Sequence, residues 1–233
     1  MKIALFGVSE IKPGKHNLKD PRLDQADKLV EADKKTYAQV DVVPEGEMLD
    51  ADGILASADG KADLILKDLE FVETRLGRDP QPAERAALEK IRGFLEAEKF
   101  LFNSGLASED LQAVAAHNFY TGKPVCVATA EEIQAPDALL LRAFREAGYI
   151  CFLTVGGKEN RAWPIRKGLT ALEAAGTIHT DLQKGFIRAE IIGFDDFVGA
   201  GGETQAKRAG KQRLETKQYI MQDCDLVNFR FNK

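Results

Sequence analysis

The sequence has few of the residues on which metal sites, disulfide frameworks and membrane anchors depend. It has three cysteines, three histidines and one tryptophan in 233 residues. The cysteines are odd in number, far apart and in no CxxC pattern, which fits a reducing cytoplasm and excludes a cysteine zinc cluster. No His-x₃-His pair, Gly-x-Ser-x-Gly elbow or apolar run of ~20 residues is present. We therefore expect a cytoplasmic protein with no metal and no membrane contact, in which Cys126, Cys151 and Cys224 are small core residues.

Charge is unevenly distributed along the chain. The net charge is −5, and apolar residues make up 44% of the sequence, enough for a packed core. Residues 1–148 carry 19 basic and 27 acidic side chains, whereas residues 149–233 carry 13 basic and 10 acidic ones. An acidic body with a mildly basic tail is compatible with a polyanion partner such as RNA, although a mixed solvated surface gives the same count.

Short apolar runs and amphipathic stretches organise the first 148 residues. Apolar residues at helical spacing predict a helix over 65–76 and a second one from Pro82, which together form an antiparallel hairpin with a heptad-like seam. Ser108 is expected to cap a third helix that runs through His117, and a further helix is expected over 137–147. Glycines, prolines and acids over 44–60 predict a loop. Strands are predicted over 2–6, 39–43 and 124–128, and a short helix over 23–32.

From Tyr149 the pattern changes to short strands separated by glycines and short helical pieces. This pattern predicts a small α+β unit of about 85 residues. The expected strands lie at 149–155, 161–165, 186–193, 219–221 and 226–231.

The tail closely resembles one known domain over its whole length. Long ordered stretches such as Phe152-Leu-Thr-Val-Gly156 and Arg161-Ala-Trp-Pro-Ile-Arg-Lys-Gly168 carry the resemblance. Further matches are 175–181, 184–190, 195–197, 210–211, 213–215 and 219–231. On these residues the tail resembles the TGS domain of YchF-type Obg-related nucleotide hydrolases, which implies a ubiquitin-like β-grasp fold. TGS domains accompany translation- and stress-related proteins, so the resemblance implies ligand- or RNA-linked regulation rather than chemistry.

The body resembles the same family in a reduced form. Asp20-Pro-Arg-Leu-Asp24, Asp63-Leu-Ile-Leu-Lys-Asp-Leu-Glu70 and Gly122-Lys-Pro-Val-Cys-Val-Ala128 match the family in order. The stretches 44–61 and 132–149 are much shorter than in the family. The resemblance implies an α/β protein: a reduced P-loop-like domain over 1–148, with an inserted helical hairpin at about 62–118, followed by a TGS domain over 149–233.

The expected phosphate-binding loop departs from the pattern G-x-x-x-x-G-K-[ST]. Six residues separate Gly7 from Gly14, so the backbone amides that converge on phosphate are wrongly spaced. Pro13 has no N–H to donate, and His16 stands where a hydroxyl would hold Mg²⁺. Gly14-Lys15 then belongs either to an ordinary polar loop or to a decayed loop that still contacts an anion.

Two further nucleotide elements of the family are altered. Asp41-Val-Val-Pro44 stands at the D-x-x-G position, where proline removes the amide that would contact the γ-phosphate. Thr129-Ala-Glu-Glu132 stands at the base-reading N-x-x-E position, and Thr129 has no amide to pair with a purine edge. We therefore expect no catalytic residue and no cofactor, with ATP or GTP as the nucleotide if any binds. The vestigial nucleotide site comprises Gly7, Gly14, Lys15, His16, Thr129 and Glu132.

Basic and aromatic side chains of the tail are candidates for ligand or RNA contact. Lysine and arginine contact phosphates and tryptophan stacks on bases. The candidates are Arg161, Trp163, His179, Lys184 and Arg188. Trp163 also fits a core position, and the basic group Lys207, Arg208, Lys211 and Arg213 also fits an exposed helix face.

Three functions are compatible with these sequence patterns. The first is a non-catalytic module that binds the ribosome, RNA or a protein partner through the hairpin and the TGS domain. The alternative is a divergent ATP- or GTP-binding protein with residual ATPase activity that uses Gly14, Lys15 and Glu132. The third is a sensor whose TGS unit binds a nucleotide-like metabolite. No feature of the sequence identifies the oligomeric state.

Overall fold

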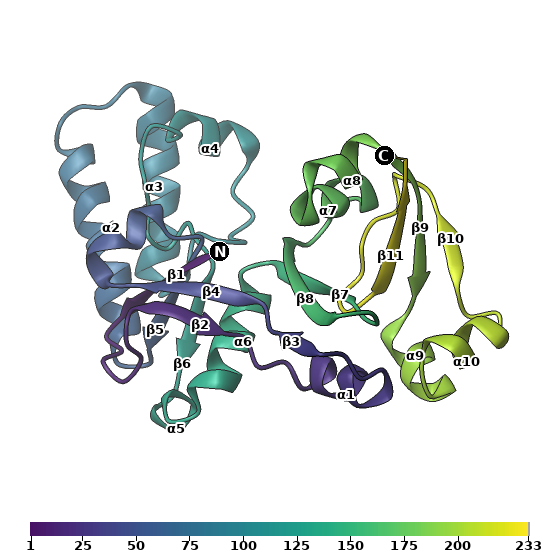
Figure 1. The fold of residues 1–233 in the computed structure, drawn as a ribbon. Coiled ribbons are helices and arrows are strands. Elements are labelled where there is room, and N and C mark those ends of the chain that lie inside the picture. Colours follow the sequence, from purple (N-terminus) through teal and green to yellow (C-terminus); the bar gives the residue numbers. More distant parts are fainter. Residues whose placement is uncertain (233) are drawn as a thin grey trace. The chain divides into compact units, whose positions relative to one another are not determined.

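The computed structural model describes residues 1–232 and divides the chain into two compact units (Figure 1). Unit 1 consists of Met1–His16 and Val40–Ala147, and unit 2 of residues 17–39 together with the chain from Gly148 onward. Each unit is built on its own sheet, so the expected mixed α/β class is confirmed. The expected single boundary at 148/149 differs from this division in one respect, because residues 17–39 pack with the second unit.

The sheet of unit 1 has the strand order β2-β4-β1-β5-β6. Four of its strands are parallel, and three of them were predicted. Parallel strands that are buried on both faces have continuous apolar runs, as β1, β5 and β6 do, whereas β4 alternates. The strands are β1 (Lys2–Phe6), β2 (Gly14–Asn17), β4 (Gln39–Val43), β5 (Gly53–Ser57) and β6 (Val125–Ala128).

The prediction of a loop over 44–60 is wrong. The structure has a 3₁₀ helix there, η1 (Glu45–Asp50), followed by β5, which pairs with β1 on one side and β6 on the other. Ile54, Leu55 and Ala56 are almost fully buried. This apolar run is short, and the glycines and acids on either side of it are typical of a loop. It becomes a central strand because it pairs with a neighbouring strand on each side.

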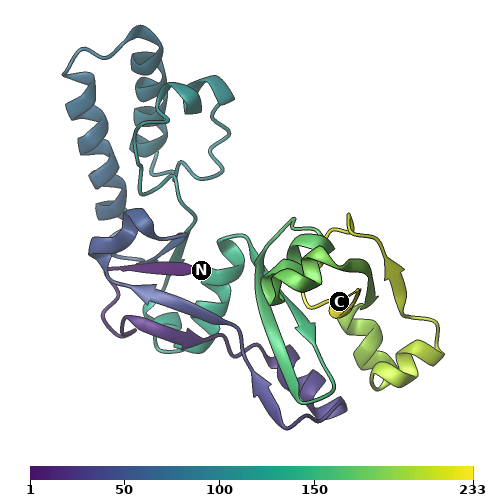
Figure 2. The same cartoon turned by 45° about the horizontal axis from the view of Figure 1, so that its top comes forward.

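The predicted helical hairpin is present as α2 (Gly60–Leu76) and α3 (Pro82–Glu96). In both views the hairpin extends from one end of the unit 1 sheet (Figures 1 and 2). Val72, Leu88, Ile91 and Leu95 form the centre of its core. The third helix is shorter than predicted: α4 covers Ser108–Ala113, and Ala107 rather than Ser108 is its N-cap.

A buried carboxylate attaches the returning chain to α2. Asp68 accepts hydrogen bonds from the backbone N–H groups of Tyr120 (2.9 Å) and Thr121 (2.7 Å) and from the Thr121 hydroxyl (2.7 Å). Burial raises the pKa of Asp68, while the bonds from Thr121 and Tyr120 oppose the rise. The three donors satisfy a group whose burial without partners would be costly.

An ion pair between Arg75 and Glu84 connects α2 to α3 at the far end of the hairpin. We expect this ion pair to break at low pH. Arg75 bonds Glu84 through Nε (2.6 Å) and Nη2 (2.9 Å), and the His117 ring lies 2.7 Å from the same carboxylate. Arg75 and then His117 lower the pKa of Glu84 to about 2. A lowered folded-state pKa stabilises the protein above the ordinary carboxyl pKa, and this stabilisation disappears as the pH falls toward 2.

We therefore expect Glu84→Gln to lower the urea midpoint at pH 7 and to differ progressively less from the wild type between about pH 4.5 and 2. Far-UV circular dichroism of both chains across this range measures the difference. Glu89→Gln, an exposed change on the same helix, is the control. A difference between wild type and Glu84→Gln that does not change with pH would contradict the assignment.

The remaining helices of unit 1 are α5 (Ala130–Ile133) and α6 (Pro136–Glu146). The predicted helix over 137–147 is thus confirmed with its ends shifted by one residue. α6 contributes buried leucines and Phe144 to the unit and contacts β5 and β6. It ends just before Gly148, where unit 2 resumes.

The sheet of unit 2 has the strand order β10-β9-β11-β7-β8-β3. β7 pairs antiparallel with β8 and parallel with β11, and β9 pairs antiparallel with β11. Its strands are β3 (Lys34–Thr36), β7 (Tyr149–Thr154), β8 (Glu159–Arg166), β9 (Phe186–Ile192), β10 (Arg213–Glu215) and β11 (Leu226–Phe231). The predicted strand over 219–221 is only an isolated bridge between Thr170 and Ile220.

Unit 2 also contains short helices. They are α7 (Ala171–Ile178), α8 (Thr180–Lys184), α9 (Phe194–Ala200), α10 (Glu203–Arg208) and α1 (Pro21–Leu29). Alanines of α7 pack with Phe152, Ile191 and Phe229 in one core. Small residues on α7 let the helix approach the sheet closely, because each removes side-chain volume from the interface.

Residues 17–39 join unit 2 through β3 and α1. β3 adds a parallel edge strand to β8, with Lys34 opposite Glu159. Asn160 is fully buried and donates to the Asp27 carboxylate (2.7 Å) and to the Val30 carbonyl (2.6 Å). It also accepts from the Gly156 N–H (2.8 Å). One amide thus connects α1, β8 and the turn before β8.

We expect Asn160→Ala to lower the free energy of unfolding of unit 2 by about 1–3 kcal/mol, because three partly buried polar groups lose their partner. Trp163 is the only tryptophan and lies on β8 in this unit, so its fluorescence during urea unfolding reports the effect. The exposed Asn228, which bonds Glu190 on another strand, provides a control variant, Asn228→Ala. Equal midpoints for wild type and Asn160→Ala would exclude this role.

Candidate functional site

The carboxyl ends of β1, β5 and β6 lie at one edge of the parallel sheet of unit 1. The chain passes from β1 to β4 on one side and from β5 to β6 on the other, so β1 and β5 mark the point where the strand order reverses. Ligands of open parallel sheets bind at this kind of position. A hollow of about 460 Å³ lies here. We call it the strand-end crevice; Gly7, Glu10, Ser57, Ala58, Asp59, Gly60, Asp63, Ala128, Ala130, Ile133 and Gln134 line it.

Gly7 allows the loop after β1 to approach the start of α2. Its φ is +65°, and a Cβ at this position would lie 2.6 Å from Ser57 Oγ. Ser57 Oγ in turn accepts a hydrogen bond from the Gly60 N–H (3.0 Å). Only glycine meets both requirements without strain. Gly7 also lines the strand-end crevice.

Three residues of the expected phosphate loop, Gly14, Lys15 and His16, lie outside the lining of the strand-end crevice. Gly14, Lys15 and His16 are part of β2, the edge strand beside β4, and Lys15 is exposed. The His16 ring lies 2.7 Å from the Lys12 carbonyl. Phosphate loops lead into a helix whose first N–H groups face the anion. In this chain the segment after Gly7 leads into a strand instead.

Thr129 and Glu132 form a helix cap. The Thr129 hydroxyl accepts from the Glu132 N–H (3.3 Å), and the Glu132 carboxylate accepts from the Thr129 N–H (2.9 Å). Arg142 also bonds this carboxylate at 3.1 Å. The pattern Thr-x-x-Glu is a capping-box signature that the sequence already contained. The hydrogen bonds of both side chains therefore stabilise the start of α5 rather than a ligand.

Carboxylates dominate the polar lining of the strand-end crevice. Glu10, Asp59 and Asp63 line it, and none of its lining residues is a lysine or an arginine. Asp59 is the N-cap of α2 and Asp63 lies in its first turn, so negative side chains already occupy the positive end of this helix. A triphosphate placed here would meet like charge. Sequence reasoning missed these acids because they come from two separated segments.

Neither Asp41 nor Pro44 lines the strand-end crevice. Asp41 is a half-buried residue of β4, and its N–H bonds the Met1 carbonyl (3.0 Å). Pro44 precedes η1 as its N-cap. Pro44 instead lines a neighbouring hollow with Gly7.

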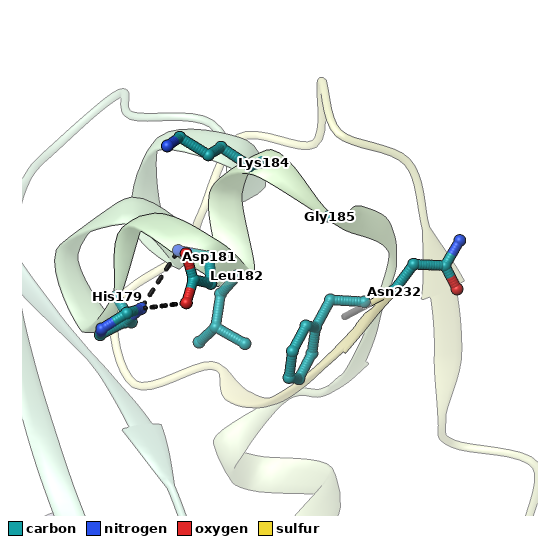
Figure 3. A pocket seen from close by; sticks show the side chains of 7 residues that line it. His179, Asp181, Leu182, Lys184, Gly185 and Asn232 are labelled. Atoms are coloured by element: carbon teal, nitrogen blue, oxygen red, sulfur yellow. Dashed lines mark hydrogen bonds and ion pairs between the residues drawn. The ribbon is translucent and has the colours of Figure 1, made fainter.

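In unit 2, two of the predicted contact residues meet at a cavity of about 840 Å³ (Figure 3). His179 and Lys184 lie at its rim, and Leu182 and Phe231 provide apolar surface. The His179 Nδ1 accepts from the Asp181 N–H (3.1 Å) and lies 3.4 Å from the Asp181 carboxylate. The lining of the cavity therefore combines one lysine, one histidine, one carboxylate and two apolar side chains.

Arg161 and Trp163 form a second group on β8. The Trp163 ring is stacked on Phe152 (6.3 Å between centroids), and its Nε1 donates to Thr154 Oγ1 (3.0 Å). The Arg161 guanidinium lies 3.9 Å from the centre of the same ring. The half-buried indole packs on the core, which fits the expected core position, whereas its contact with a ligand or RNA stays a prediction. Arg188 lies apart, exposed on β9.

The second basic group is largely paired within the unit. Lys207 bonds Glu203 (2.6 Å), Lys211 bonds Asp196 (3.0 Å), and Arg213 bonds Glu215 (3.1 Å). Arg208 is exposed at the end of α10. These local pairs favour an exposed, solvated helix face over a dedicated anion site.

The three cysteines are buried and unbonded to one another. Burial, with Glu146 nearby, raises the pKa of Cys126 to about 12. Burial also raises the pKa of Cys224. Both are thiols at neutral pH and therefore poor nucleophiles. Within residues 1–232 there is no group of three His, Cys, Asp or Glu side chains placed to hold a metal ion. None of the helices in this range combines the length and apolar character needed to cross a membrane.

Comparison with family models identifies the tail. Residues 149–232 match the model described as "YchF-GTPase_C: Protein of unknown function (DUF933)". The match begins at β7 and covers most of unit 2, apart from residues 17–39.

Similar proteins extend the match into unit 1. "Ribosome-binding ATPase YchF" of Haemophilus influenzae is 35% identical over 73% of this chain and 64% of its own length. The protein of the same name from Escherichia coli O157:H7 is 57% identical over 35% of this chain and 22% of its own length. "Obg-like ATPase 1" of Rattus norvegicus is 52% identical over 35% of this chain. The chain therefore spans less than two thirds of the length of the curated relatives it matches.

Two solved structures share the fold. The Schizosaccharomyces pombe YchF GTPase superposes with a TM-score of 0.75 at 18% identity, over 99% of this chain and 97% of that one. A GTP binding protein from Pyrococcus horikoshii OT3 superposes with a TM-score of 0.51 at 14% identity, over the whole of both chains. At these identities the likeness concerns the arrangement of helices and strands alone.

Proposed function

Because this chain belongs to the YchF/Obg-related family, we propose that it is a ribosome-linked binding module that does not hydrolyse nucleotides. In this proposal unit 1 is a scaffold derived from a nucleotide-binding domain, and the tail is a TGS domain with a β-grasp fold. The ribosome is proposed as partner because relatives carry the name "Ribosome-binding ATPase YchF".

One observation carries the non-catalytic part of the proposal. The strand-end crevice, where the phosphates would bind, is lined by Glu10, Asp59 and Asp63 and by no basic side chain. Lys15, the single lysine of the Gly-Lys pair, lies on an edge strand outside this lining. Phosphate binding needs converging amides and a cation, and negative charge in their place opposes it.

The tail supplies the surfaces for binding. The parallel pairing of β7 with β11, the antiparallel pairing of β7 with β8 and the packing of α7 on this sheet support the β-grasp assignment. We propose Arg161 with Trp163, His179 with Lys184, and Arg188 as the contacts to ribosomal RNA. Arginine and lysine meet phosphates, and an indole that is half exposed offers a stacking face.

Nucleotide binding is tested by calorimetric titration of the full chain with Mg-ATP and with Mg-GTP. We expect no heat of binding at micromolar concentrations and no steady release of phosphate. Micromolar binding with turnover would overturn the non-catalytic proposal. The retained sheet and its strand-end crevice, together with the ATPase names of the relatives, favour residual ATPase activity as the second candidate. In that case the family resemblance of Gly14-Lys15 predicts that Lys15→Ala abolishes the measured rate.

Ribosome binding is tested by sedimentation of the full chain with purified ribosomes through a sucrose cushion. A variant with Arg161→Ala, Lys184→Ala and Arg188→Ala is expected to bind at least about tenfold more weakly, because three charged contacts of roughly 0.5–1 kcal/mol multiply. Lys12→Ala, Arg78→Ala and Lys99→Ala remove three exposed charges of unit 1 and form the control. Equal losses in both variants, or no binding by the wild type, would contradict the proposed surface.

A further inference from the structure

One face of α2 is exposed along two turns of the helix. Asp63, Leu66, Lys67 and Glu70 occupy positions i, i+3, i+4 and i+7, which lie on one side of a helix. All four are exposed, and Leu66 retains 49% of its surface. Leu66 is thus an apolar side chain at the centre of a charged helical face.

This face continues into the strand-end crevice. Asp63, Leu66, Lys67 and Glu70 line a hollow of about 490 Å³ together with Phe6, Gly7, Glu45 and Gly60. The hollow shares Gly7, Gly60 and Asp63 with the strand-end crevice. We call the combined surface the acidic groove. Its carboxylates are Glu10, Glu45, Asp59, Asp63 and Glu70, and its apolar centre is Leu66 beside Phe6.

Most of the negative charge in the acidic groove is unpaired. Among residues 1–232, Asp59, Asp63 and Glu70 have neither an ion-pair nor a hydrogen-bond partner. Lys67 is the only lysine that lines the acidic groove. Its Nζ lies 3.4 Å from the Glu45 carboxylate and 5.7 Å from the centre of the Phe6 ring, so it is already paired within the chain. Carboxylates of one sign around an apolar centre attract a cationic partner and repel nucleic acid.

We propose that the acidic groove binds a basic segment of another protein, whose lysine or arginine side chains meet Asp59, Asp63 and Glu70 while an apolar side chain covers Leu66. The eleven helical steps from Asp59 to Glu70 extend about 16 Å, the length of roughly five residues of extended chain. A short peptide with alternating basic and apolar residues therefore reaches all three carboxylates. This surface lies entirely on unit 1 and is independent of the ribosome contact proposed for unit 2.

The probe for this proposal is a short fluorescent peptide of alternating lysine and leucine, titrated with the full chain and followed by anisotropy. The same peptide with glutamate in place of lysine is the negative probe. We expect the basic peptide to bind and to weaken markedly between about 50 and 200 mM salt, because exposed charge pairs are screened.

Two variants locate the site. Asp59→Asn, Asp63→Asn and Glu70→Gln together are expected to weaken binding by at least about tenfold. Leu66→Ser is expected to weaken it by about threefold to tenfold, since it removes a buried apolar contact. Glu73→Gln, Glu89→Gln and Glu96→Gln change the net charge equally at exposed positions of the hairpin and should leave binding within about twofold. Circular dichroism confirms that each variant is folded.

Three outcomes would overturn the proposal. The first is no binding by the wild type. The second is an equal loss in the control triple variant, which would mean attraction by net charge alone. The third is spermine binding that depends on the three carboxylates while Leu66→Ser leaves peptide binding unchanged, which would identify a small polyvalent cation as the occupant.

Discussion

Replacing Phe152 with alanine is expected to lower the free energy of unfolding of unit 2 by about 3–5 kcal/mol. Phe152 has no exposed surface and lies on β7, at the centre of the sheet. Its ring stacks on Trp163 of β8 (6.3 Å) and meets Phe229 of β11 edge-on (5.9 Å). The variant loses the transfer free energy of the ring and leaves a cavity between three strands that cannot close around it.

Urea unfolding followed by the fluorescence of Trp163 measures this loss. Trp163 is the only tryptophan, so the signal reports unit 2 and not the hairpin or the sheet of unit 1. Leu111→Ala, on α4 of unit 1 where the side chain is 53% exposed, is the control and should leave the midpoint unchanged. A loss below about 1 kcal/mol for Phe152→Ala would mean that this ring does not organise the core.

The same variant separates the two proposals about binding. A partly unfolded unit 2 should lose the proposed ribosome contact, because Arg161 and Trp163 are placed by β8. The acidic groove of unit 1 should keep its affinity for the basic peptide. Loss of both by Phe152→Ala would indicate that the two units do not unfold separately.

Gly7→Ala is expected to lower the free energy of unfolding of unit 1 by about 2–4 kcal/mol. Part of this cost is the φ of +65°, which an L side chain adopts only with strain. The rest is steric, because the new Cβ would lie 2.6 Å from Ser57 Oγ and would displace it from the Gly60 N–H. The contact that holds the loop after β1 against the start of α2 would open.

A matched glycine separates the two contributions. Gly105 has a φ of +76° and no atom within 4 Å of a Cβ, so Gly105→Ala carries the backbone strain alone. Far-UV circular dichroism in urea is the measurement, because unit 1 has no tryptophan. The double variant Gly7→Ala with Ser57→Ala should be destabilised by less than the sum of the two single variants, because the steric overlap is relieved. Equal destabilisation by Gly7→Ala and Gly105→Ala would show that the contact with Ser57 contributes nothing.

Local patterns were sufficient to predict many of the elements. The apolar runs at β1 and β4 and the helical periodicity of α2 and α3 specify their own structure, because a strand or an amphipathic helix shows its buried face within a few residues. The family resemblance of the tail was also present in its ordered motifs, and the family is confirmed. The expectation that the altered loop at Gly7–His16 holds no nucleotide stays a prediction.

The sequence by itself determined the type of these elements and the absence of a regularly spaced phosphate loop, since proline chemistry and residue spacing are local properties. The tertiary structure decided the rest. It placed β5 between β1 and β6, joined β3 to β8 across more than a hundred residues, and engaged Thr129 and Glu132 in a helix cap. It also brought Glu10 to Asp59 and Asp63 in one hollow. These features depend on contacts between segments that are distant in the sequence. A short stretch of sequence does not show which distant segment it contacts, and therefore does not show how much free energy that contact contributes.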